Sequence, residues 1–139
     1  MDGFTLDPRL AKDCLPLGKF TISHLLLMNN ALVPWFILVP ETEHIELIDL
    51  TAEDQVQVLE EINQVSRFIQ NNFPVTKLNT AAIGNIVSQL HIHIIGRHQQ
   101  DFCWPNVVWG TQQREPYTEQ AINKLKRELH EQLGKYLKP

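Results

Sequence analysis

Two histidines separated by one apolar residue are the strongest chemical signal in this sequence. They occur in the segment Gln-Leu-His-Ile-His-Ile-Ile at residues 89–95. Successive side chains of a β-strand point to opposite faces, so a strand here would place Gln89, His91 and His93 on one face and their apolar neighbours in a core. Neutral imidazole is a nucleophile, a proton carrier and a metal ligand near pH 7. The segment therefore indicates a strand with one chemically reactive face.

The spacing alone leaves three uses of this histidine pair open. In the first, His91 attacks phosphorus and forms a labile P–N bond, while His93 hydrogen-bonds a phosphate oxygen or the leaving group. In the second, both histidines bind zinc together with a later residue, for which the candidates are His98, Asp101 and Cys103. In the third, the pair is structural.

The loop ahead of the histidines shifts the balance toward phosphate chemistry. It reads Asn-Thr-Ala-Ala-Ile-Gly-Asn at residues 79–85. Gly84 permits close approach of the backbone, and Asn85 brings a neutral amide. Backbone N–H groups in such a turn receive a phosphate without a basic side chain, which suits an acidic protein. An ordinary hairpin turn is the alternative interpretation of this loop.

The composition indicates one domain without a strong electrostatic partner. The 139 residues are 43% apolar, which is enough for a core, and the net charge is −4. This charge disfavours a general grip on nucleic acid or on an anionic membrane. Residues 1–4 lack the features of a signal peptide, and the longest apolar runs are too short to cross a bilayer. Because two cysteines in such a chain are expected to stay reduced, we expect a cytoplasmic protein.

Capping residues and apolar periodicity predict three helices. A short helix is expected to begin at Asp7-Pro8 and to end near Cys14, because Asp caps helices and Pro suits a first turn. A longer helix is predicted over residues 52–70, with Thr51 as its N-cap and apolar residues at helical spacing. A second long helix is predicted over residues 118–133, ending at Gly134.

Strands are predicted between these helices, over residues 23–28, 35–39, 78–82 and 87–95. The first two are joined by a short loop and so are expected to pair antiparallel. Residues 97–115 show no period, and a long irregular stretch of this kind is often functional. The order of strands and helices predicts an α+β fold with an antiparallel sheet.

Residues 25–97 resemble the histidine triad (HIT) family, whose motif is His-φ-His-φ-His-φ-φ with φ apolar. Residues 89–95 look like this motif, and Met28-Asn29-Asn30 followed by residues 34–40 resembles the family's first substrate loop and strand. Residues 43–50 look like the connection into its long helix. The later Trp104-Pro105 and Trp109-Gly110 resemble a bacterial branch of the family. The resemblance implies a single HIT-like domain over residues 1–139, with an antiparallel sheet of about five strands and two main helices.

The resemblance also implies an activity and a set of site residues. HIT proteins hydrolyse or transfer nucleoside phosphates at the α-phosphate through a nucleotidyl-histidine intermediate, as with nucleoside phosphoramidates and dinucleoside polyphosphates. His91 then corresponds to the nucleophile, and His93 to the residue that contacts the phosphate and helps the leaving group. Substrate contacts are implied for the ribose at Asn29, for the phosphate region at Asn79, and for the family's Gly-Gln turn at Gly84 and Asn85.

Cofactors and partners follow from the same reading. No cofactor is required, although Mg²⁺ could accompany a polyphosphate substrate, and many family members are homodimers whose sheets join. Trp104 and Trp109 are candidates for stacking on a base, with a dimer interface or core packing as alternatives. Arg97 either neutralises phosphate or pairs with Asp101.

The sequence departs from the family pattern at three positions. Gln89 replaces the first histidine of the triad, but its main-chain carbonyl can still accept from the Nδ1–H of His91, so we retain it as a catalytic candidate. Trp35-Phe36 stands where a Gly-His pair is common, and Ile86 stands where a Ser or Thr often binds phosphate. These departures motivate a second hypothesis, a nucleotide-binding or sensing module without turnover. A zinc-binding protein is the third.

Overall fold

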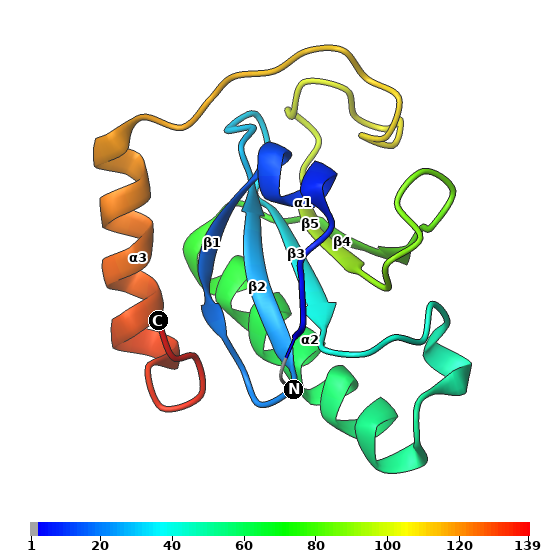
Figure 1. Cartoon of the computed structure of the whole chain (residues 1–139). Coiled ribbons are helices and arrows are strands. Elements are labelled where there is room, and N and C mark those ends of the chain that lie inside the picture. The colour runs from blue at the N-terminus through cyan, green and yellow to red at the C-terminus, as the bar shows by residue number, and fades with distance from the viewer. Residues whose placement is uncertain (1–2) are drawn as a thin grey trace.

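A five-stranded antiparallel sheet forms the centre of the computed structural model (Figure 1). The structure describes residues 3–139. Met1 and Asp2, which belong to the segment expected to lack the features of a signal peptide, lie outside the described residues. The sheet has the order β1-β2-β3-β5-β4. Its strands are β1 (Cys14–Lys19), β2 (Ser23–Met28), β3 (Trp35–Pro40), β4 (Lys77–Ala82) and β5 (Ile92–Arg97). The helices are α1 (Pro8–Asp13), α2 (Ala52–Asn72) and α3 (Glu119–Leu133), with a 3-10 turn, η1, at Leu47–Asp49. The predicted α+β fold is confirmed.

Both faces of the sheet are buried, each by different elements. The long helix α2 covers one face, and α3 packs against the same core at the β1 side (Figure 1). Leu90, Ile92 and Ile94 point into this core, as the alternation of residues 89–95 predicts. The opposite face is covered by α1, by the N-terminal segment and by the loop that follows β5. The histidine side chains lie on this second face.

The helices form where capping and periodicity predict them. Thr51 accepts from the backbone N–H of Asp54 at the start of α2, and Thr118 caps α3 in the same way. Asp7 accepts from Arg9 N at the start of α1. The apolar stripe of α2 buries residues at helical spacing, among them Val58, Val65 and Ile69.

Two strands differ from the sequence prediction. Strand β1 was not predicted, because Pro16 and Gly18 interrupt it and the pairing with β2 shifts between these two residues. An edge strand tolerates such residues. Strand β5 begins at Ile92 instead of residue 87, and the irregular segment ahead of it carries Gln89 and His91. The sheet therefore reaches five strands, as the family resemblance implies.

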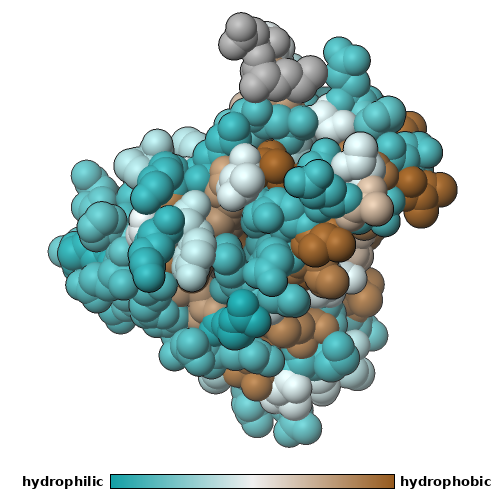
Figure 2. Space-filling model, turned by 90° about the horizontal axis from the view of Figure 1, so that it is seen from below, coloured by the Kyte–Doolittle hydropathy of each residue, from teal (hydrophilic) through white to brown (hydrophobic). Residues whose placement is uncertain are grey.

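The surface is mostly polar. Figure 2 shows scattered hydrophobic groups on a largely hydrophilic face seen from below. The most exposed large apolar side chain is Ile48, at 82% exposure. Within residues 3–139, no helix combines the length and the apolar character that crossing a membrane requires.

Candidate active site

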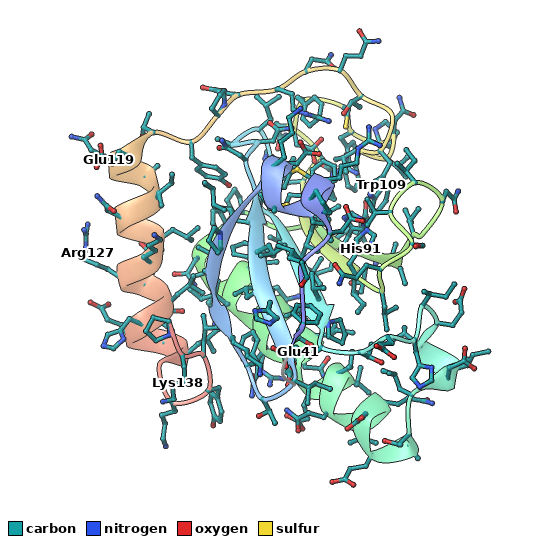
Figure 3. The ribbon with its side chains drawn as sticks, viewed as in Figure 1. Glu41, His91, Trp109, Glu119, Arg127 and Lys138 are labelled. Carbon is teal, nitrogen blue, oxygen red and sulfur yellow. The ribbon has the colours of Figure 1, made fainter. Side chains whose placement is uncertain are left out.

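His91 and His93 lie side by side on one face of the sheet. Their ring centroids are 4.9 Å apart and the rings are tilted by 68°. His93 sits in β5 between Ile37 of β3 and Ala81 of β4, and His91 lies just before the strand begins. Both are nearly buried, with exposures of 5% and 6%. Figure 3 shows His91 and Trp109 on the side of the sheet remote from α3. The predicted shared face is confirmed, although only His93 belongs to a regular strand.

The backbone fixes the orientation of the His91 ring. His91 Nδ1 lies 2.7 Å from the main-chain oxygen of Gln89. A carbonyl only accepts hydrogen bonds, so Nδ1 carries the proton and Nε2 keeps a lone pair. In the neutral ring this contact leaves Nε2 as the nitrogen available for nucleophilic attack.

His93 is enclosed by aromatic rings. The indole Nε1 of Trp35 lies 3.0 Å from His93 Nδ1, and the ring of Trp109 stands edge-on to His93 at 5.3 Å. Burial, and then the charge of His91, lower the pKa of His93 to about 4. His93 is therefore neutral near pH 7.

A small polar hollow opens beside His91. It has a volume of about 200 Å³ and is lined by residues 82–85 and 88–91 together with Ile45 and Glu46. Gly84 and Asn85 are exposed on its wall, whereas the side chain of Ile86 points away from the protein with 77% exposure. The predicted turn and the predicted nucleophile thus border the same space.

The Gln89 side chain is engaged away from the histidines. Its Oε1 accepts from the backbone N–H of Asp7 at 2.8 Å, and its Nε2 donates to the carbonyl of Thr5 at 2.9 Å. The N-terminal segment is held against the site in this way and lines a second hollow that shares Ile45, Ser88 and Gln89 with the first. Gln89 thus reaches His91 through its carbonyl and the N-terminal segment through its amide.

Arg97 is buried, and its guanidinium bonds several groups of the protein. Its guanidinium forms two hydrogen bonds with the Asp101 carboxylate, at 2.7 and 3.0 Å, and donates to Asn79 Oδ1 at 3.0 Å. Trp104 lies over the same guanidinium at 5.7 Å. Burial opposes ionisation of Asp101, but the bond from Arg97 and two backbone N–H groups lower its pKa below the usual value. Arg97 therefore pairs with Asp101, and neither Asn79 nor Trp104 lines the hollow beside His91.

Asn29 contacts the segment that leads into α3. Its Oδ1 accepts from the backbone N–H of Tyr117, and the neighbouring Asn30 accepts from Glu115 N. Both asparagines hold the segment that leads into α3. Of the predicted substrate residues, the structure thus brings Gly84 and Asn85 to His91, while Asn29, Asn79 and Trp104 make contacts within the chain.

A model of the HIT domain matches residues 11–100 of the chain. The chain belongs to the histidine triad (HIT) family. A histidine triad protein from Marinobacter aquaeolei is 40% identical, with a TM-score of 0.90 and coverage of 96% of this chain and 98% of that one. Another from Sinorhizobium meliloti is 38% identical, with a TM-score of 0.91 and coverage of 96% and 99%.

A third HIT structure, histidine triad protein from Bradyrhizobium japonicum, is 36% identical with a TM-score of 0.89 and covers 94% of this chain and 98% of that one. No curated protein matches the chain. The likeness extends over nearly the whole length, so it includes α3 and the loop after β5, beyond the segment that the family model matches.

Two tryptophans of this HIT protein were not assigned to the histidines from the sequence. Trp35 was noted only as a departure from a Gly-His pair, and Trp109 only as a candidate for stacking, an interface or the core. Both contact His93, from β3 and from the loop after β5. The sequence signal for Trp35 was its place in an apolar strand, directly before the family's histidine position at Phe36.

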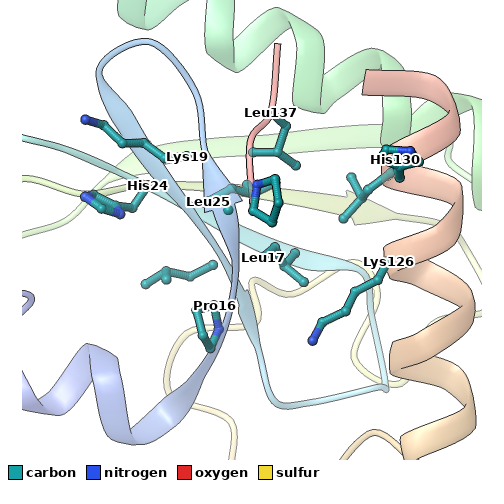
Figure 4. Close-up of a pocket in the computed structure, with 12 residues that line it drawn as sticks. Pro16, Leu17, Lys19, His24, Leu25, Lys126, His130 and Leu137 are labelled. Carbon is teal, nitrogen blue, oxygen red and sulfur yellow. The ribbon is translucent and has the colours of Figure 1, made fainter. Parts of the chain in front are cut away.

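A larger cavity lies elsewhere, between β1, β2 and α3 (Figure 4). It has a volume of about 610 Å³ and an apolar floor that includes Leu17, Leu25 and Leu137. Neither catalytic candidate lines it. His24 borders this cavity; its Nε2 lies 2.7 Å from Glu41 Oε1, and its ring stacks on Phe4.

The hypothesis of a zinc-binding protein requires a set of at least three ligands. Among residues 3–139, no group of three or more His, Cys, Asp or Glu side chains is arranged to hold a metal ion. Cys103 lies against Arg97, and Cys14 is buried, which together with Asp13 raises the pKa of its thiol to about 12.

Proposed function

We propose that this HIT protein is a nucleotide hydrolase or nucleotidyl transferase that acts at the α-phosphate through a nucleotidyl-His91 intermediate. The observation that carries the proposal is the bond between His91 Nδ1 and the Gln89 carbonyl, which leaves Nε2 as the nucleophile at the wall of a polar hollow. The carbonyl belongs to the main chain, so glutamine in place of the first triad histidine preserves it.

The reaction divides into two substitutions at phosphorus. His91 Nε2 forms a bond to the α-phosphorus while the bond to the leaving group breaks, and the leaving group takes the electron pair and a proton from solvent. The ring then carries a positive charge, which the Gln89 carbonyl stabilises by accepting from Nδ1–H. Water attacks the same phosphorus and gives a proton to solvent, the P–N electrons return to Nε2, and a nucleoside monophosphate is released. In a transfer reaction another acceptor replaces the water.

Substrates of the phosphoramidate or dinucleoside polyphosphate type suit this site. The α-phosphate is placed against the backbone of Gly84 and Asn85, where no basic side chain is required. His93 donates to a phosphate oxygen or to the leaving atom. Mg²⁺, where a polyphosphate substrate brings it, would be bound to that substrate.

The test is to trap the intermediate. The protein is incubated briefly with a nucleoside phosphoramidate labelled at phosphorus, quenched in base, and separated by electrophoresis. Wild type is expected to carry label, and His91→Ala and His91→Gly are expected to carry none. His130→Ala, which changes a histidine of α3, is the control and is expected to label like wild type. Equal labelling of all variants contradicts the proposal.

A binding module without turnover is the competing function, and Gln89, Phe36 and Ile86 are the departures that motivate it. Calorimetry with nucleoside monophosphates, run beside the hydrolysis assay, distinguishes the two. Binding without label and without turnover supports the sensing function.

We also propose a homodimer in which two sheets join. Strand β4 is an outer strand of the sheet, and among residues 3–139 no strand pairs with its far edge. Such an edge is a ready template for another strand. Sedimentation equilibrium is expected to give twice the chain mass of 16.1 kDa, and the mass of one chain contradicts the proposal.

A further inference from the structure

We propose that Trp35 is a positioning residue whose indole N–H holds His93 in the tautomer that carries its proton on Nε2. The assignment of the tautomer rests on geometry alone. Its catalytic consequence rests on the function proposed above, in which His93 donates to phosphate or to the leaving atom.

The first step in the argument is the chemistry of the bond. The Trp35 Nε1 and His93 Nδ1 atoms are 3.0 Å apart, and both side chains are buried. An indole N–H only donates, so the nitrogen that faces it must offer a lone pair. A neutral imidazole has one N–H, and with Nδ1 as acceptor that hydrogen is on Nε2.

The second step is the rigidity of the contact. Trp35 pairs with Ile95 across β3 and β5, and Ile37 pairs with His93, so Trp35 and His93 are diagonal neighbours on the same sheet face. Trp35 is 3% exposed. Trp109 stands edge-on to both rings, at 6.3 Å from Trp35 and 5.3 Å from His93. The two rings therefore have little freedom to exchange partners with water.

The third step concerns the protonation state. Burial, and then the charge of His91, lower the pKa of His93 to about 4, so the ring has a single N–H near pH 7. The ring of His93 is in contact with the rings of His91, Trp35 and Trp109. A neutral His93 cannot act as an imidazolium, and only the tautomer decides whether it offers a donor at Nε2.

The consequence is that the two adjacent imidazoles are held in opposite tautomers. His91 donates from Nδ1 to the Gln89 carbonyl and offers a lone pair at Nε2. His93 accepts at Nδ1 and offers an N–H at Nε2. One ring is prepared to attack phosphorus, and the other to donate to the oxygens around it. Without the Trp35 N–H, the alternative tautomer of His93 would turn a lone pair toward a negatively charged phosphate.

The tautomer is tested without any substrate. Protein labelled with ¹⁵N in its six histidines is studied by long-range ¹H–¹⁵N correlation at pH 7, where the two tautomers give different patterns. His93 is assigned by the signals that His93→Gln removes. In wild type, His93 is expected to show a protonated Nε2 and an unprotonated Nδ1. The opposite pattern overturns the proposal, and this outcome needs no variant of Trp35.

Two tryptophan variants form a matched pair. Trp35→Phe keeps an aromatic ring and removes the donor to His93, so the His93 signals are expected to move toward the Nδ1–H form. Trp109→Phe removes an indole N–H that has no hydrogen-bond partner among the described residues, so the His93 tautomer is expected to stay unchanged. A His93 pattern that is the same in wild type and Trp35→Phe overturns the role of Trp35.

Labelling kinetics separate this inference from the proposed function. In a single-turnover reaction, Trp35→Phe is expected to form nucleotidyl-His91 at least about tenfold more slowly than wild type, as for loss of one aligned donor. Equal rates overturn the positioning role. If wild type forms no adduct while its His93 spectrum is as expected, the proposed function fails and the tautomer assignment stands.

Discussion

Two glycines near the site serve different purposes at the scale of single residues. A Cβ added at Gly96 would lie 2.7 Å from Ile69 Cγ2 and 2.9 Å from Pro34, so the packing of the sheet on α2 requires glycine there. A Cβ at Gly84 would lie 3.6 Å from the nearest atom, the Val87 carbonyl, which is ordinary contact. Packing among the described residues therefore does not require glycine at position 84. Close approach of a ligand to the backbone would explain it.

Gly84→Ala is therefore expected to separate binding from folding. The methyl group fits the free protein but obstructs a phosphate that approaches the backbone, so nucleotide affinity and labelling of His91 are expected to fall about tenfold or more. The melting temperature is expected to stay near that of wild type, whereas Gly96→Ala is expected to lose about 1–3 kcal/mol of unfolding free energy through overpacking. Thermal unfolding and calorimetry measure the two effects. Undiminished labelling by Gly84→Ala would remove Gly84 from the substrate site.

The sequence was sufficient to predict that His91 and His93 lie side by side and that the Gly84 turn lies near them. These residues are close in the chain, and the alternation of side chains along a strand is a local property. It was not sufficient for Trp35, which lies 58 positions before its partner. That contact depends on the register of β3 against β5, and a shift of one residue would turn Trp35 to the other face.

At the scale of elements, the Gln89 side chain connects the histidine segment to the start of the chain. Its amide bonds the backbone of Thr5 and Asp7, and Asp7 in turn caps α1. These two bonds use the carbonyl oxygen and the NH₂ group of a single side-chain amide, which a histidine at this position would lack. The substitution in the family motif therefore coincides with a tethered N-terminal segment.

Gln89→Ala is expected to release that segment and to leave the chemistry largely intact. Loss of the two bonds removes about 1 kcal/mol each from the local opening free energy, so the Asp7 amide is expected to exchange hydrogen faster. The main-chain carbonyl that orients His91 is unchanged, so nucleotidyl labelling is expected to persist. NMR-detected exchange and the labelling assay measure these outcomes. Loss of label with a folded variant would show that the side chain itself takes part in catalysis.

The helices were predictable as elements, whereas β1 and the starting residue of β5 were not. Caps and apolar periodicity are local signals, and Thr51 and Thr118 begin helices as expected. In contrast, β1 contains Pro16 and Gly18 and exists because β2 offers a partner. The apolar residues of the segment ahead of β5 resemble strand residues, but Gln89 and His91 make local and N-terminal contacts instead of ladder bonds.

At the scale of the whole molecule, the buried histidine links stability to pH. The pKa of His93 is about 4 in the folded protein against 6.5 as the reference value, so between these values the unfolded chain binds more protons. Stability therefore decreases as pH falls from about 6.5 to 4, by at most about 3 kcal/mol from this residue.

Urea unfolding at pH 7 and pH 5 tests this linkage. Wild type is expected to lose more unfolding free energy between these values than His93→Gln, because the variant lacks the titrating ring. His130→Ala is the control because the His130 ring is exposed. Its unfolding free energy is expected to fall between pH 7 and pH 5 by the same amount as that of wild type. A difference between pH values that is the same for wild type and His93→Gln would place the pH dependence in other groups.

The pair of indoles around His93 gives the protein an internal optical reporter. An imidazolium ring quenches the emission of a tryptophan that it touches, and here one ring touches two of the chain's three tryptophans. Ionisation of His93 can therefore be followed in the native polypeptide by its tryptophan fluorescence, without any attached dye.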